Sequence, residues 1–255
     1  HPRGVDIDNN MESDYFGSIY VTEGMSTTST TYFPASNGGV GLYIFNPDMT
    51  TVKNEKTGQS AFMGGFTYTF ISYAADLARV RVAEDGRIFV TRCNNAGDYI
   101  AYAKNQGDLV ANDKFYSLLA GGTLDATTYE YNTAEGFLAS SNIGLDVKGS
   151  GENLKLLAHS GNKTTFSLAN TSGSRTCEYA LGNAEVLPMP TQIESLSNVT
   201  IAPQVTNVEY DSRGGIWYCQ YRATPSESQP SLIYVDAEGN RKLFEGTGGL
   251  PRGGG

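Results

Sequence analysis

The residues best suited to ligand binding gather near the C-terminal end of the sequence, where Trp217, Tyr221 and Arg222 combine two aromatic rings with a cation. Aromatic faces pack on the C–H faces of sugars, and polar groups beside them bond to the sugar hydroxyls. These three residues are therefore a candidate carbohydrate site. Because successive residues of a strand point to opposite faces, Trp217 and Tyr218 cannot both line one site, and packing of Trp217 in the core is the alternative.

A second candidate site is a set of four residues that occupy the same place in four repeats. They are Asp6, Arg81, Asp146 and Glu209. If the strands that carry them are the innermost strands of a ring of sheets, the four side chains line a central channel. A mostly acidic ring suits a cation or a polar ligand. The alternative is a water-filled channel in which the charges are solvated or paired through Arg81.

The segment 6–14 concentrates four carboxylates in nine residues. Oxygen-bearing side chains at alternate positions suit a hard cation such as Ca²⁺. Here they belong to Asp6, Asp8, Asn10 and Glu12. A calcium loop, however, has Gly where Met11 stands and Glu where Gly17 stands. We therefore predict a solvated hairpin turn, with a bound calcium ion as the alternative.

Motifs of catalysis are absent from the sequence, which has no GxSxG elbow, no HExxH pair and no glycine-rich phosphate loop before a helix. The cysteines are Cys93, Cys177 and Cys219. They are odd in number, have no zinc-site spacing and lie in strand-like contexts, so we predict that they pack as small buried hydrophobes. No catalytic residue is assigned, and no cofactor is expected beyond the calcium alternative.

The composition excludes several classes of protein. With 27 acidic against 18 basic residues the net charge is −9, which argues against nucleic-acid binding because that needs a basic face. Only 18% of the residues are charged, fewer than in a typical helical protein. The uncharged segment 59–75 contains too many Gly, Ser, Thr and Tyr residues to span a membrane, and we expect buried strands there.

A repeat of about 62 to 69 residues organises the chain. Each copy has two apolar residues spaced by two, a turn rich in Asp or Gly, and a second apolar strand. The copies are Arg3–Glu23, Arg79–Arg92, Gly144–His159 and Asn207–Tyr221. Registered on the second strand, the equivalent residues are Ile19, Ile88, Leu154 and Ile216. Further strands follow in each copy, most clearly in Gly41–Thr50 and Ser231–Phe244, so each unit has about four strands.

Repeated four-stranded antiparallel units are typical of a β-propeller. We therefore predict an all-β propeller of four blades, with a sandwich as the alternative. The expected blades are 2–77, 78–141, 142–204 and 205–250. Residues 251–255 repeat the Pro-Arg-Gly of residues 2–4 and are expected to start a further blade. The chain is accordingly hypothesised to be part of a larger propeller.

The blades resemble those of the NHL, YVTN and lactonase-like propeller superfamily, in copies such as AEDGRIFVTR, DSRGGIWYCQY and SLIYVDAEGNRKLF. The acidic composition, rich in Asn, Thr and Tyr, is similar to that of secreted or surface propellers of Bacteroidota. The resemblance implies an exported protein, periplasmic or on the cell surface, that is lipid-anchored through a removed leader.

Long polar and aromatic loops on a rigid scaffold, without a catalytic constellation, favour a non-catalytic binding or scaffolding module. Its expected partners are a glycan or a protein of an outer-membrane nutrient-uptake complex. The alternative, which the resemblance suggests, is a lactonase-like hydrolase or a lyase with a divalent cation in the channel.

Overall fold

A computed structural model of the chain describes residues 2–23, 41–62, 76–93, 99–117, 122–123, 143–160, 175–184, 191–192, 205–220 and 232–243. The expected further blade at 251–255 lies outside these ranges, as do residues 24–40 and 224–230.

The described strands form four antiparallel sheets, in each of which every strand pairs with the next one in sequence. Sheet 1 contains β1 (Pro2–Ile7), β2 (Ile19–Glu23), β3 (Gly41–Phe45) and β4 (Ala61–Phe62). Sheet 2 contains β5 (Asp76–Val82), β6 (Ile88–Cys93), β7 (Tyr99–Ala103), β8 (Tyr116–Ser117) and β9 (Gly122–Thr123). Sheet 3 contains β10 (Ile143–Lys148), β11 (Lys155–Ser160), β12 (Arg175–Ala180) and β13 (Thr191–Gln192). Sheet 4 contains β14 (Val205–Tyr210), β15 (Ile216–Gln220), β16 (Leu232–Val235) and β17 (Arg241–Leu243).

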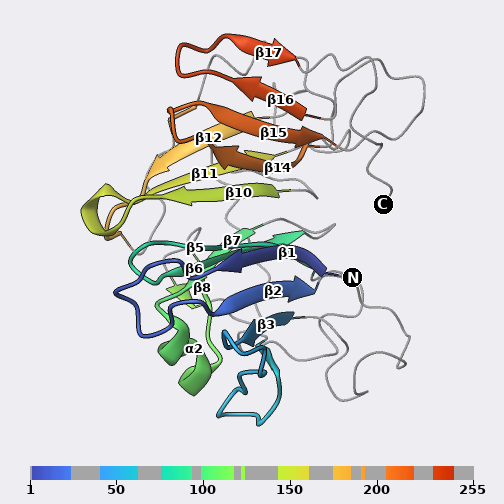
Figure 1. Ribbon diagram of the computed structural model, residues 1–255, viewed down its shortest axis with the longest axis vertical. Coiled ribbons are helices and arrows are strands. Elements are labelled where there is room, and N and C mark those ends of the chain that lie inside the picture. Colours follow the sequence, from blue (N-terminus) through green and yellow to red (C-terminus); the bar gives the residue numbers. More distant parts are fainter. Residues whose placement is uncertain are drawn as a thin grey trace, which may run out of the picture.

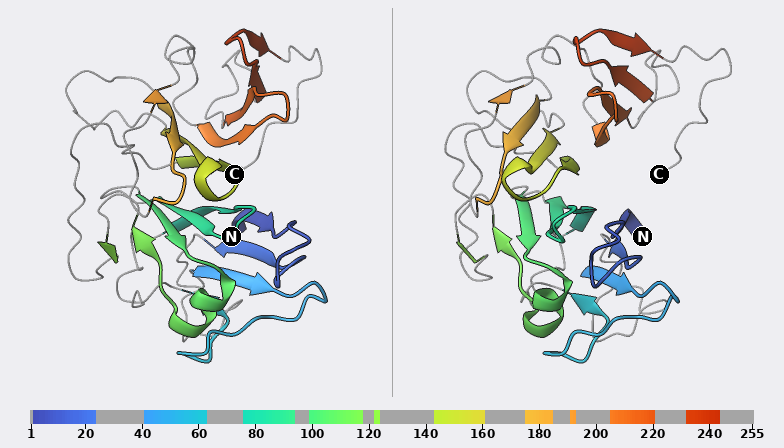
Figure 2. Two further views of the ribbon diagram at one scale, coloured as in Figure 1. Left: turned by 90° about the vertical axis from the view of Figure 1, so that its left-hand side faces the viewer. Right: turned by 60° about the vertical axis from the view of Figure 1, so that its left-hand side comes forward.

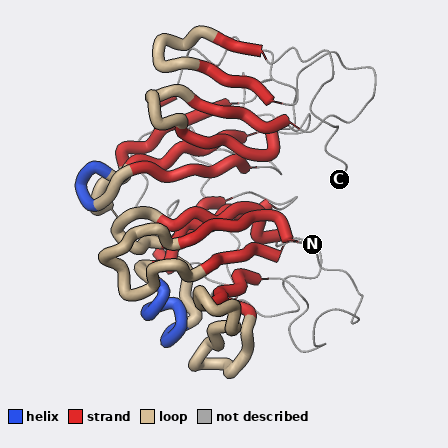
Figure 3. The backbone as a smooth tube through the Cα atoms, viewed as in Figure 1, coloured by secondary structure: helices blue, strands red, loops and turns tan. Residues whose placement is uncertain are grey.

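The sheets follow one another in chain order as the blades of a propeller (Figure 1). Their first strands β1, β5, β10 and β14 are neighbours, and Figure 2 shows the four sheets around an arc with these strands toward its inside. Figure 3 shows how little of the described chain is helical. The predicted all-β propeller class is confirmed.

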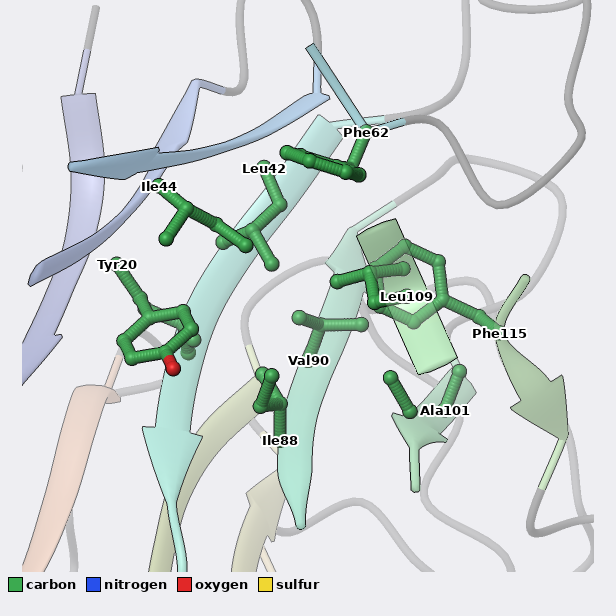
Figure 4. Close-up of a cluster of buried hydrophobic side chains, with 11 residues drawn as sticks. Tyr20, Leu42, Ile44, Phe62, Ile88, Val90, Ala101, Leu109 and Phe115 are labelled. Atoms are coloured by element: carbon green, nitrogen blue, oxygen red, sulfur yellow. The ribbon is translucent and has the colours of Figure 1, made fainter. Parts of the chain in front are cut away.

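Each sheet buries its apolar residues against the neighbouring sheet. Because side chains alternate along a strand, each sheet has a forward face, toward the next sheet in the chain, and a backward face toward the previous one. Between sheets 1 and 2, the forward-facing Tyr20, Leu42 and Ile44 pack against the backward-facing Ile88 and Val90 (Figure 4). Two more buried clusters fill the interfaces between sheets 2 and 3 and between sheets 3 and 4. The core is therefore divided among the interfaces between blades.

Glycine makes two of the predicted hairpin turns. Gly86 and Gly214 have φ values of 83° and 90°, a backbone conformation that residues with a side chain rarely adopt. The β10–β11 connection contains a 3₁₀ turn, η1 (Gly151–Asn153), and eight residues separate Val147 from Leu156, whereas five separate Val82 from Ile88. For this reason the predicted second-strand equivalence of Leu154 is wrong. The residue that pairs as Ile19, Ile88 and Ile216 do is Leu156, opposite Val147.

Sheet 2 differs from the expected pattern in three ways. It has five strands where four were expected, and β5 begins at Asp76, two residues before the expected start of the blade. Its β7 is also followed by a helix, α2 (Gln106–Asn112), where an all-β blade was expected. Asn105 caps this helix, because its Oδ1 accepts the Asp108 N–H at 2.8 Å. None of the described helices is long and apolar enough to cross a membrane.

Candidate functional site

The four ring residues predicted from the repeat occupy equivalent places in the structure. Asp6, Arg81, Asp146 and Glu209 all lie on the first strand of their sheet and pair with the residue that follows Ile19, Ile88, Leu156 or Ile216 on the second strand. Their cross-strand partners are Tyr20, Phe89, Leu157 and Trp217. Each ring residue thus lies on the forward face of its sheet, at the inner edge of the arc.

These residues line a pocket of about 630 Å³ to which all four first strands contribute. The polar lining also includes Asn9 after β1, Arg79 on β5 and Asn207 on β14. Cys219 reaches the pocket from β15 and is exposed, so the prediction that it is a buried hydrophobe is wrong. Its exposure follows from its place on the forward face of sheet 4, against which the structure describes no further sheet.

Asp6 and Asp146 each join their sheet to the next one. The Asp6 Oδ2 accepts the Val82 N–H of β5 at 2.7 Å, and the Asp146 Oδ2 accepts the Tyr210 N–H of β14 at 2.7 Å. In both sheets the donor is the residue that follows the ring position. The same carboxylate position therefore makes the same hydrogen bond at two interfaces between blades.

A glycine two residues before each of these aspartates permits the close approach. A Cβ on Gly4 would lie 2.9 Å from the Cα of Arg79, and a Cβ on Gly144 would lie 2.8 Å from the backbone nitrogen of Val208. These two atoms are backbone and cannot swing aside as a side chain would, although the Thr22 Oγ1 also lies 2.8 Å from the Cβ position of Gly4. The repeated Gly-x-Asp sequence is therefore an interblade contact motif, whose glycines carry no signal in the strand pattern alone.

The interface between sheets 2 and 3 is built differently, because its ring residue is a cation. The Arg81 Nε donates to the Asp146 Oδ1 at 2.9 Å, and the Arg81 Nη2 lies 3.9 Å from the Glu209 Oε2. The Arg81 and Asp146 side chains are only 13% and 11% exposed, whereas Glu209 is 65% exposed. Arg81 is thus held between two carboxylates, as in the alternative interpretation of the ring.

The ring carboxylates are held in a partly dehydrated environment. Burial raises the pKa of Asp146 above its ordinary value, against the opposing effects of the Tyr210 N–H and the Arg81 charge. Burial likewise raises the pKa of Asp6, although the Val82 N–H stabilises its charged form. Desolvation is the larger influence in both cases.

The ring residues do not fit a calcium site. Both Asp146 oxygens already accept hydrogen bonds, Asp6 holds the Val82 amide, and the Arg81 guanidinium lies among the carboxylates and would repel a second cation. Within the described ranges, no group of three or more His, Cys, Asp and Glu side chains could hold a metal ion.

The acidic segment 6–14 forms a self-contained turn. The Asp8 carboxylate accepts the Asn10 N–H at 3.0 Å and the Ser13 hydroxyl at 2.6 Å, and it is 2% exposed. Asp6 lies on β1, so it does not share this loop with Glu12. The Asn10 side chain donates to the Glu84 carbonyl of sheet 2 at 2.8 Å. These contacts make a hairpin turn, but its Asp8 carboxylate is buried and not solvated as predicted. The turn also helps to attach sheet 1 to the β5–β6 turn.

The candidate sugar-binding residues are only partly within the described chain. Tyr221 and Arg222 lie outside it. Trp217 lies on the forward face of sheet 4, with its ring centroid 4.7 Å from that of Tyr234. Its Nε1 donates to Asp211 Oδ1 at 3.4 Å. Trp217 is absent from the pocket lining, so the two candidate sites are adjacent on one face and not a single site.

Comparisons with known proteins give limited information about this site. No family model matches the sequence, and no curated protein matches it either. Among solved structures, the chain is similar to the crystal structure of regucalcin, a calcium-binding protein from Agrobacterium tumefaciens, with a TM-score of 0.45 and 12% sequence identity. The match covers 91% of this chain and 56% of that one, so the chain spans little more than half the length of regucalcin.

Proposed function

We propose that the chain is a non-catalytic binding propeller whose pocket takes an uncharged polar ligand of the carbohydrate class. The observation that carries the proposal is the placement of Arg81 between Asp146 and Glu209. A hydroxyl group donates one hydrogen bond and accepts others, so neighbouring guanidinium and carboxylate groups satisfy it from both sides. The amides of Asn9 and Asn207 add donors and acceptors to the lining of the same pocket.

The arrangement favours binding over the lactonase-like alternative. A metal-dependent hydrolase needs carboxylate oxygens that are free to coordinate a cation or to exchange a proton. In this pocket, Asp6 and Asp146 hold backbone amides of neighbouring sheets, and Asp146 also holds Arg81. These carboxylates therefore have a positioning role, which leaves the pocket polar and nearly charge-compensated.

A glycan array followed by calorimetric titration of the bound polysaccharide tests the proposal. We expect Arg81→Gln to weaken binding by at least tenfold, since a hydrogen bond to a charged group contributes about 1.5–3 kcal/mol. Asn9→Ala, which removes an exposed side chain, should weaken binding severalfold without affecting the fold.

Arg87→Gln is the matched control for the arginine variant. Arg87 lies in the β5–β6 turn and contacts the Gly182 carbonyl in the turn after β12 at 2.8 Å, but it is not part of the pocket lining. Its substitution should leave affinity unchanged. Equal affinities for Arg81→Gln and the wild type would refute the proposed site. Metal analysis of the purified proteins addresses the hydrolase alternative. One bound divalent ion per chain in both the wild type and Arg81→Gln would favour it.

For the setting, we propose an exported, periplasmic or surface-exposed protein that presents this pocket to a glycan or within an outer-membrane uptake complex. This part rests on the resemblance of the blades to surface propellers. Protease treatment of intact cells, with immunodetection of the protein, tests it: loss of the signal from whole cells supports surface exposure, whereas recovery only in the soluble cytoplasmic fraction would contradict export.

A further inference from the structure

Three positively charged residues follow one another across sheet 2, just beyond its aromatic residues. The β6–β7 pairing, continued by one residue past Ile88 and Ala103, places Arg87 opposite Lys104. The β7–β8 pairing, continued in the same direction, places Lys104 opposite Lys114. Like charges at directly opposite positions of neighbouring strands are unfavourable. The sequence thus places three cations in one row, although the net charge of the chain is −9.

An aromatic row beside these residues holds two of the cations over one ring. Phe89, Tyr102 and Tyr116 are paired across the strands, with ring centroids 6.1 Å and 5.5 Å apart. The Nζ of Lys104 lies 5.1 Å from the centroid of the Tyr116 ring, and the Nζ of Lys114 lies 4.7 Å from it. The face of an aromatic ring attracts a cation. Tyr116 therefore draws the two ammonium groups to one place despite their mutual repulsion.

The three cations differ in their partners. Arg87 is satisfied, because its Nη2 donates to the Asp85 carboxylate at 2.7 Å and to the Gly182 carbonyl at 2.8 Å. Within the part of the chain that the structure describes, no ion pair or hydrogen bond includes Lys104 or Lys114. Lys104 is exposed and Lys114 is partly exposed, so both can be reached from solvent. Two ammonium groups are thus available to a ligand.

Helix α2 fixes the spacing of the two lysines, since it forms the connection from β7 to β8. Lys104 precedes the N-cap residue Asn105, and Lys114 follows the C-cap residue Asp113. The Asp113 N–H donates to the Leu109 carbonyl at 2.8 Å, so the last turn of the helix is closed as well as the first. A helix that is capped in this way holds the residues at its two ends at a fixed distance. The backbone therefore positions both lysines before a ligand arrives.

We propose that Lys104, Lys114 and the Tyr116 hydroxyl form a second binding site, which takes a doubly charged tetrahedral oxyanion, a sulfate or phosphate group. Each ammonium group donates hydrogen bonds and accepts none, and such a group has acceptor oxygens on every side. Its two negative charges balance those of the two lysines. The Tyr116 hydroxyl is a third donor, and it makes no hydrogen bond to the described residues.

This site is separate from the pocket and does not depend on the carbohydrate proposal. None of its three residues lines the pocket, and Tyr116 packs at the margin of the apolar cluster between sheets 2 and 3. The pocket, by contrast, is lined by the first strands of the sheets. The oxyanion is either a free inorganic ion or an ester group on a polysaccharide, and the experiments below distinguish these two sources.

An NMR titration of the ¹⁵N-labelled protein with sodium sulfate, at an ionic strength held constant with sodium chloride, tests the site. The amide signals of Lys104 and Tyr116 should shift and saturate. Lys104→Gln and Lys114→Gln should each weaken sulfate binding about fivefold, as expected for one exposed ion pair. Tyr116→Phe keeps the ring and should weaken binding by a smaller factor.

Lys155→Gln is the matched control, because it removes the same charge from an exposed lysine of sheet 3. Lys155 is paired with Glu178 at 2.8 Å, and its substitution should leave the sulfate affinity unchanged. Shifts that stay linear in sulfate concentration, or equal affinities for Lys104→Gln and the wild type, would overturn the proposal. A loss of affinity in Lys155→Gln as large as in the other two lysine variants would overturn it as well, since sulfate would then respond only to net charge.

Dextran sulfate and unmodified dextran identify the source of the oxyanion. A site for a sulfated polysaccharide should bind dextran sulfate about tenfold or more tightly per sulfate group than sodium sulfate, because neighbouring groups rebind at high local concentration. A site for the free ion should bind both equally per sulfate group. In either case Lys104→Gln should weaken the binding of dextran sulfate and leave that of dextran unchanged. Binding of dextran sulfate that neither Lys104→Gln nor Lys114→Gln weakens would refute the site.

Discussion

Removal of the Asp146 side chain should destabilise the protein more than any other single change in the pocket wall. Its carboxylate joins three sheets, since it accepts the Arg81 Nε at 2.9 Å and the Tyr210 N–H at 2.7 Å from strands on either side. Each hydrogen bond to a charged group contributes about 1.5–3 kcal/mol, and breaking a buried pair costs about 3–5 kcal/mol. With side-chain exposures of 13% and 11%, the Arg81–Asp146 pair approaches the buried limit. We expect Asp146→Ala to lower the free energy of unfolding by about 3–4 kcal/mol.

Two further variants separate the interactions of Asp146. Asp146→Asn keeps an acceptor for the Tyr210 N–H and loses the charge that faces Arg81, so it should cost about 1–2 kcal/mol. A double-mutant cycle with Arg81→Met should give a coupling free energy of about 1–3 kcal/mol, because the two side chains are in direct contact.

Urea unfolding followed by the fluorescence of Trp217, the single tryptophan, is a suitable assay because this residue lies in a sheet that Asp146 holds. Glu12→Ala, in an exposed part of the β1–β2 turn, is the control and should not move the midpoint. If Asp146→Ala falls within about 0.5 kcal/mol of the wild type, the range typical of neutral surface changes, then the interblade role of this carboxylate is refuted.

Three other changes test the interfaces. Gly144→Ala places a Cβ 2.8 Å from the backbone nitrogen of Val208 and should cost about 1–3 kcal/mol in urea unfolding; an unchanged midpoint would show that the sheets can separate freely. Tyr20→Phe removes the hydroxyl that donates to the buried Gln106 Oε1 at 2.6 Å and should cost about 1–2 kcal/mol by the same assay, whereas no cost would mean that water replaces it. Burial lowers the pKa of His159 to about 3 from 6.5, so the unfolded chain takes up a proton between these values and the folded chain does not. Stability should therefore fall as the pH drops from 6.5, by up to about 1.4 kcal/mol per pH unit, and His159→Gln should abolish that contribution. Equal pH dependence of the two proteins would contradict this assignment.

The sequence pattern was sufficient to predict the blades and the ring position, for a physical reason. In each strand, every second residue faces the same neighbouring sheet, so apolar residues recur at alternate positions. The tight hairpins between strands need glycine at positive φ, as at Gly86 and Gly214. Both signals are local, so they can be read without knowledge of the fold. The common register of Asp6 and Asp146 follows from them directly.

What could not be predicted depends on contacts between segments far apart in the chain. The position of Leu156 in the register depends on how many residues the η1 turn takes up. The partners of Arg81 depend on the angle between sheets 2 and 3, which no single strand encodes. Helix α2 did have a local signal, the capping Asn105 three residues before Asp108, but one short helix in a strand-rich chain is easily overlooked.

The hydrogen bond from a first-strand amide to the carboxylate of the preceding blade has a consequence for how such a chain can evolve. One partner is a side chain and the other is main chain, so the donating residue is free to vary, and here it is valine in one blade and tyrosine in another. A duplicated or exchanged blade would meet this requirement with whatever residue it brought. A fold joined in this way can add blades and diverge at most positions while its geometry persists.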